Sequence, residues 1–83
     1  LLNQKKWFPP HNIMNQIKKS LILSGHKTSI ALEKEFWKAL EIISENKNIG
    51  IDKLIEKIDK KERNGSLASA IRVFILKKFM KLN

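Results

Sequence analysis

The chain contains no cysteine and only two histidines, His11 and His26, which lie far apart in the sequence. Without cysteine, neither a disulfide framework nor a thiolate metal site can hold the fold together. Two distant histidines do not make a zinc site, so we expect no metal and no cofactor. No apolar run approaches the roughly 18 residues of a membrane-spanning helix, and Leu21-Ile22-Leu23 is too short for the apolar core of a signal peptide. We therefore expect a soluble cytoplasmic protein without a membrane partner.

Patterns that indicate catalysis are also missing. The sequence has no Ser-His-Asp spacing and no glycine-rich phosphate loop, and its acidic residues are interspersed with lysines. No pair of carboxylates suggests general acid–base chemistry. We predict that the protein is not an enzyme.

Acidic residues are absent from both ends of the chain. Residues 1–32 carry a net charge of +5 and residues 63–83 another +5, whereas residues 33–62 carry −1. Positive charge gathered at the ends favours a polyanionic partner such as nucleic acid. A basic but inert surface, or attraction to anionic membranes, are the alternatives from charge alone.

One stretch, residues 27–32, has the alternation of a half-buried strand. Thr28, Ile30 and Leu32 share one face, suited to a core, while Lys27, Ser29 and Ala31 share the other, which is small, polar and basic. So short a chain offers this strand no evident partner. We therefore predict that it pairs with the same strand of a second copy.

The segment before this strand has two possible structures. Residues 20–24 form an apolar run of strand length, and Gly25 interrupts it. Residues 20–32 are then either a tight hairpin or one longer strand bent at Gly25. We favour the bent strand, and we expect residues 1–17 to be a flexible extension of a domain spanning residues 18–83.

Three helices are predicted after the strand, at about residues 33–47, 51–62 and 66–81. In the first, Phe36, Ala39, Leu40 and Ile43 form the expected buried stripe, with Trp37 on its flank. We expect Asn48 to be the left-handed residue that ends this helix and Ser66 to cap the third.

The third helix is apolar over most of its circumference. Only Arg72, Lys77, Lys78 and Lys81 are charged within it. A helix that is apolar all round is normally buried. One copy of an 83-residue chain has little material for such burial, so this helix also favours a dimer.

The order strand, helix, short turn, helix resembles the ribbon-helix-helix DNA-binding family of the Arc and MetJ type. The resemblance covers roughly residues 26–62, with Asn48-Ile49-Gly50 standing where the family has a Gly-apolar-Ser turn. The stretches 25–32 and 65–72 further resemble a small bacterial subfamily that has an additional C-terminal helix. The fold class expected is mainly α with one short strand, in an intertwined homodimer with an antiparallel two-stranded ribbon between protomers.

The resemblance also implies roles for individual residues. The ribbon would enter the DNA major groove, with Lys27, Ser29 and Ala31 facing the bases. Backbone N–H groups at Gly50 and Ile51, with Lys53 beside them, would hold a phosphate at a helix N-terminus, and Lys18 and Lys19 would add charge near the ribbon. The expected dimer core comprises Thr28, Ile30, Leu32, Phe36, Leu40, Leu54, Ile58, Ile71 and Phe74.

The sequence thus predicts a homodimeric DNA-binding protein, a transcriptional regulator associated with the bacterial nucleoid, with double-stranded DNA and its own copy as partners. The alternative is an antitoxin-like or adaptor dimer whose third helix binds a partner protein. A third hypothesis, binding of that helix to a membrane surface, fits less well because its apolar surface is too wide for an interfacial helix.

Overall fold

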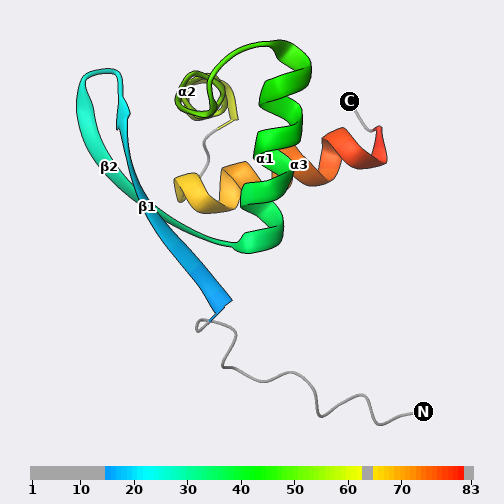
Figure 1. Ribbon diagram of the computed structural model, residues 1–83, viewed down its shortest axis with the longest axis horizontal. Coiled ribbons are helices and arrows are strands. Elements are labelled where there is room, and N and C mark those ends of the chain that lie inside the picture. The colour runs from blue at the N-terminus through cyan, green and yellow to red at the C-terminus, as the bar shows by residue number, and fades with distance from the viewer. Residues whose placement is uncertain (1–14, 63–64, 82–83) are drawn as a thin grey trace, which may run out of the picture.

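Two strands followed by three helices make up the chain in the computed structural model, which describes residues 15–62 and 65–81 (Figure 1). The elements are β1 (Gln16–Leu23), β2 (His26–Glu33), α1 (Lys34–Lys47), α2 (Ile51–Glu62) and α3 (Leu67–Met80). Most of the expected extension, residues 1–17, lies outside the described residues. Its last two residues, Gln16 and Ile17, begin β1.

The two strands form an antiparallel hairpin within one chain. Register runs from Leu23 opposite His26 to Gln16 opposite Glu33. Ser24 and Gly25 connect the strands with φ angles of 51° and 83°, and two positive values are characteristic of a type I′ turn. The prediction of a bent strand at Gly25 is therefore wrong, and so is the premise that the strand lacks a partner in its own chain.

Helix α1 begins after Glu33 and ends at Asn48, whose φ of 58° and ψ of 43° confirm the predicted left-handed cap. Its buried residues are Trp37, Leu40, Ile43 and Ser44, whereas Phe36 is only half-buried. The prediction of a buried Phe36 with Trp37 on the flank was therefore wrong. Residues Ile17 and Lys19 of β1 contact Trp37 and cover that side of the helix. The Trp37 indole N–H donates to the Ile17 carbonyl at 2.8 Å, which anchors the indole beneath the hairpin.

Helix α3 has a buried face and an exposed apolar face. Ser66 caps it as predicted, accepting a hydrogen bond from the Ser69 N–H at 3.1 Å. Leu67, Ala70, Ile71 and Ile75 are buried, but Val73, Leu76, Phe79 and Met80 are 44–57% exposed. The expectation that this helix is buried all round is wrong for a single chain, since the other elements cover only one side of it.

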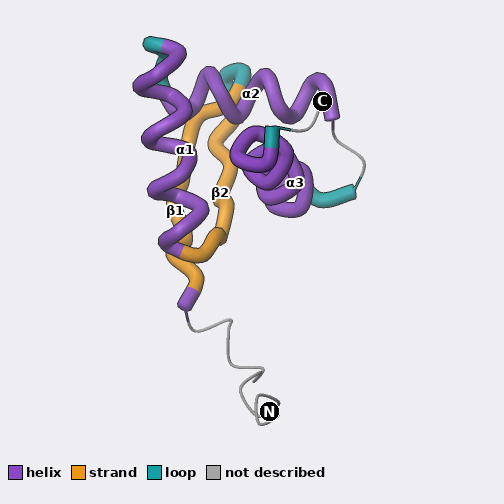
Figure 2. Tube along the Cα trace, turned by 90° about the vertical axis from the view of Figure 1, so that its right-hand side faces the viewer, coloured by secondary structure: helices purple, strands orange, loops and turns teal. Residues whose placement is uncertain are grey.

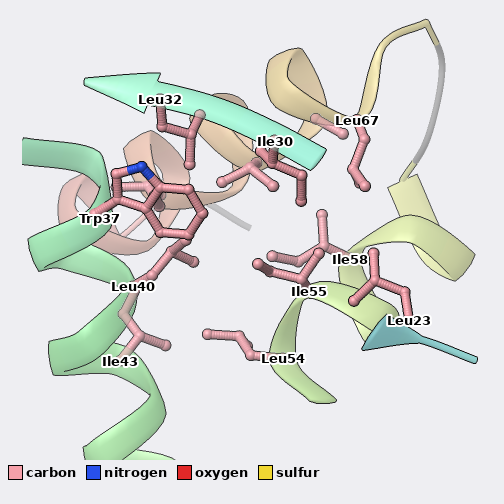
Figure 3. Close-up of a cluster of buried hydrophobic side chains, with 13 residues drawn as sticks. Leu23, Ile30, Leu32, Trp37, Leu40, Ile43, Leu54, Ile55, Ile58 and Leu67 are labelled. Carbon is pink, nitrogen blue, oxygen red and sulfur yellow. The ribbon is translucent and has the colours of Figure 1, made fainter. Parts of the chain in front are cut away.

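The core lies between the hairpin and the helices. The hairpin lies to one side of the helices in Figure 1, and in the view of Figure 2, turned by 90°, it runs behind α1. Side chains from all five elements meet there, and the most deeply buried are Leu32, Leu40, Leu54, Ile55 and Ile71 (Figure 3). Six of the nine residues predicted for a dimer core are already buried within one chain: Ile30, Leu32, Leu40, Leu54, Ile58 and Ile71. A single copy therefore buries more than its length suggested.

Candidate nucleic-acid interface

The hairpin turns one face toward the helices and the other toward solvent. Residues directly opposite each other in an antiparallel pair share a face, so the register assigns the outer face to four cross-strand pairs. These pairs are Gln16–Glu33, Lys18–Ala31, Ser20–Ser29 and Ile22–Lys27. We call the last three pairs the hairpin outer face.

The three residues predicted to face DNA bases all lie on the hairpin outer face. Lys27 and Ser29 are exposed, and Ala31 is half-buried. Ile30 and Leu32 point the other way and are 4% and 0% exposed. A single chain thus presents a two-stranded surface of basic, hydroxyl and small apolar groups.

The sequence analysis missed the contribution of β1 to this surface. Ser20 and Ile22 lie beside Ser29 and Lys27, and the two serine hydroxyl oxygens are 3.4 Å apart. Ile22 is 56% exposed. The sequence pattern that could have predicted β1 is the alternation of Ile17, Leu21 and Leu23. Lys19 interrupts this pattern, because it places a charge at a position that faces the core.

Lys18 and Lys19, predicted together as phosphate contacts, lie on opposite faces of the hairpin. Lys18 belongs to the hairpin outer face. The Lys19 ammonium lies 4.9 Å from the centroid of the Trp37 ring, a cation–π distance that stabilises a charge beside an aromatic face. Of the two, only Lys18 shares the surface that carries Lys27 and Ser29.

The N-terminus of α2 holds a carboxylate where a phosphate was predicted. Asp52 Oδ1 accepts a hydrogen bond from the Lys53 N–H at 2.9 Å. The same oxygen would lie 2.8 Å from a Cβ placed on Gly50. Gly50, Ile51 and Lys53 are adjacent as predicted, but a phosphate could reach their N–H groups only if this carboxylate rotated away.

The tip of the hairpin is fastened to α2. The Ser24 N–H donates to Glu56 Oε2 at 2.6 Å, and the Lys53 ammonium lies 3.8 Å from Glu56 Oε1. This chain of contacts brings the turn and the first half of α2 together. These contacts hold the hairpin turn next to the first half of α2.

Glu33 fastens the other end of the hairpin. Arg72 of α3 donates from Nε and Nη2 to Glu33 Oε1 at 3.2 and 3.1 Å, and the Gln16 amide donates to Oε2 at 3.2 Å. The pKa of Glu33 lies below its ordinary value, chiefly because a backbone hydrogen bond favours the carboxylate. Partial burial opposes this shift, and Gln16 and Arg72 reinforce it. Glu33, which adjoins the hairpin outer face at this end of the hairpin, is thereby bound to a cation.

The parts of the chain that the structure describes contain no group of three or more His, Cys, Asp or Glu residues that could hold a metal ion. None of the helices in these parts is long and apolar enough to cross a membrane.

A model of the ribbon-helix-helix domain matches residues 16–79, which span the hairpin and nearly all of the three helices. The chain belongs to the ribbon-helix-helix family. Members of this family use a DNA-binding fold found in transcriptional regulators, and the fold is generally not enzymatic. Comparison with curated proteins and with solved structures gave no significant match.

Proposed function

We propose that this ribbon-helix-helix protein is a homodimeric transcriptional regulator of the cytoplasm that inserts its hairpin into the DNA major groove. The observation that carries the proposal is the hairpin outer face. It combines the lysines and serines of both strands with two apolar side chains, and the adjoining acid, Glu33, is held by Arg72. A two-stranded ribbon fits the major groove, where each base pair presents its own pattern of donors and acceptors.

The residues of this face have complementary tasks in the proposed complex. The Lys27 ammonium donates to guanine acceptors, and the serine hydroxyls donate to or accept from bases of either kind. Ala31 and Ile22 offer only apolar contact, which suits a thymine methyl group. Lys18, at the end of the face away from the turn, adds charge for the phosphate backbone.

Dimerisation is proposed through the outer edge of β2. One edge of β2 pairs with β1, and across residues 15–62 and 65–81 no backbone hydrogen bond outside the hairpin involves β2. Alternate N–H and C=O groups on the outer edge are therefore directed away from β1. Pairing with β2 of a second copy would satisfy these groups and continue the sheet across the dimer axis. The two β2 strands would then be the central pair of the sheet and would form the ribbon that meets the bases, with each β1 strand flanking it.

Phosphate contacts at the start of α2 complete the proposal. Helix N-termini favour anions through their free N–H groups and the helix dipole. Here Asp52 competes with the phosphate for the Lys53 N–H. We propose that DNA displaces the Asp52 carboxylate, which makes this contact weaker than one at an open helix end.

The DNA contacts are tested by the double variant Lys27→Ala/Ser29→Ala. Binding to duplex DNA should weaken because base-edge contacts in the major groove each contribute about 1–3 kcal/mol. Removing Lys27 should also reduce the steepness of the salt dependence. Fluorescence anisotropy over a salt series measures both quantities. The control Lys38→Ala removes the same charge from an exposed site on α1, and equal behaviour of the two variants would overturn the proposed DNA contacts.

The dimer is tested with single cysteines, which have a clean background because the natural chain has none. Lys27→Cys, Ser29→Cys and Ala31→Cys place a thiol at successive outward positions of β2. If two β2 strands pair antiparallel, the variant nearest the two-fold axis should form a disulfide between copies under mild oxidation, since paired strands bring Cα atoms within disulfide range. Non-reducing electrophoresis reports the product. Cross-linking of a Leu76→Cys control alone would place the contact on α3 instead.

A second candidate function is the binding of a partner protein through α3. The exposed Val73, Leu76, Phe79 and Met80 form an apolar strip on this helix, and such strips mark interaction sites. Stoichiometric co-purification of a protein that is lost with Leu76→Lys, together with no duplex binding at moderate salt, would favour this candidate over DNA binding.

A further inference from the structure

A groove with an apolar floor and a basic rim lies where the end of α1, the outer side of α2 and the middle of α3 meet. Its cavity volume is about 450 Å³. Leu54 and Ile58 form the floor, each 2% exposed, and the half-buried Phe74 forms one wall. The rim consists of the exposed lysines Lys47, Lys57, Lys60 and Lys61.

Among the side chains that the structure describes, none of the rim lysines is paired with an acid. None of the four forms an ion pair with any side chain in residues 15–61 or 65–81. Lys47, Lys60 and Lys61 occupy the last turns of their helices, where they complement the helix dipole. That effect does not account for Lys57, which lies in the middle of α2. The four positive charges at the edge of one cavity indicate an anionic occupant.

The groove continues along α1 and α3. A neighbouring cavity of about 270 Å³ shares Lys47 and is lined by Ile42, Ile43, Asn46, Lys78 and Phe79. Ile42 and Phe79 are 41% and 55% exposed. An occupant that fills both cavities must therefore be elongated, apolar on the side that meets the protein and negatively charged along its flanks.

We propose that this groove docks an acidic amphipathic helix of a partner protein. Apolar side chains three and four residues apart would contact Phe74, Ile42 and Phe79, and flanking carboxylates would meet the lysine rim. The apolar groups of duplex DNA are thymine methyls within the major groove, which offer no continuous apolar face to the floor, and no residue of the hairpin lines either cavity. A second copy of this chain, docked groove to groove about a two-fold axis, would set the four rim lysines against the same four lysines. This inference requires neither the DNA contacts nor the β2 dimer.

The test uses the full chain and two labelled model peptides of identical composition, rich in Glu and Leu. One peptide places its leucines at helical spacing, and the other has the same residues in an order that gives no apolar face. Fluorescence anisotropy should show the amphipathic peptide binding at least about tenfold more tightly than its isomer, because only it can fill the floor while meeting the rim. Equal affinities would show that the groove binds negative charge without recognising an apolar helix face, and would overturn the proposal.

Two variants locate the binding site. Lys57→Glu/Lys61→Glu reverses the rim without touching the core and should weaken the amphipathic peptide by at least about tenfold. Lys34→Glu/Lys38→Glu makes the same charge change on exposed positions of α1 outside both cavities and should weaken it much less. An equal loss in the two variants, or none in the first, would refute docking in this groove. Lys27→Ala/Ser29→Ala should leave peptide binding intact, which separates this site from the proposed DNA surface.

Discussion

Glu33 shows how one side chain joins three parts of the fold. It ends β2, precedes α1, and accepts hydrogen bonds from Arg72 of α3 and Gln16 of β1. The Arg72 guanidinium also lies 5.7 Å from the Phe36 ring centroid. At the level of sequence, Glu33 was only an acid in the first turn of a helix, because contacts between distant residues leave no local pattern.

The lowered pKa of Glu33 predicts a pH dependence of stability. A carboxyl whose pKa is lower in the folded state stabilises the fold above its unfolded pKa, and this contribution disappears as the pH falls through the folded pKa. The pKa of an ordinary glutamate is 4.5, so the loss should occur on acidification below that pH. Glu33→Gln should be less stable than the natural chain at neutral pH, and the difference should shrink toward acid.

Urea unfolding followed by circular dichroism at several pH values measures this difference. The control Glu35→Gln removes an exposed acid of the same helix turn that makes none of the Glu33 contacts. A Glu33→Gln difference that stays constant from neutral to strongly acid pH would show that ionisation of Glu33 does not contribute.

At the scale of elements, the hairpin was the main feature that the sequence left open. Helix order, the Asn48 cap and the Ser66 cap followed from local patterns. The pairing of β1 with β2 did not, because Lys19 broke the alternation of β1 and Ser24-Gly25 fits a bend as well as a turn. The structure shows why a charged Lys19 can face the helices. Its ammonium lies against the Trp37 ring, and the Trp37 indole N–H donates to the carbonyl of Ile17 nearby.

The turn itself predicts a difference between two substitutions. Gly25 has a φ of 83°, and nothing lies within 4 Å of a Cβ built there, so a side chain meets only backbone strain. Gly25→Ala should destabilise the fold by about 1–2 kcal/mol, the cost of the left-handed region for an ordinary residue. Gly25→Asn should cost less, because asparagine tolerates that region. Thermal unfolding compares the two variants, and equal losses would contradict the type I′ turn.

The whole molecule has one closed core and several surfaces of distinct chemistry. The hairpin outer face is basic and hydroxyl-rich, α3 exposes an apolar strip, and the groove between the helices combines an apolar floor with lysines. Net charge alone indicated a polyanionic partner without locating it. The outward direction of Lys27, Ser29 and Ala31 was derived from alternation, whereas Ser20, Ile22 and the groove emerge only when separate elements pack together.

Methylation interference is the sharpest test of whether the hairpin outer face enters the major groove. Duplexes are first selected from a random pool by the natural protein, then methylated at guanine N7, an acceptor that faces the major groove. If the hairpin outer face enters the groove, N7 methylation at symmetrical guanines should block binding, and Lys27→Ala should lose this sensitivity at one guanine in each half-site. Binding that ignores N7 methylation throughout, or a methylation pattern unchanged in Lys27→Ala, would contradict entry of this face into the groove.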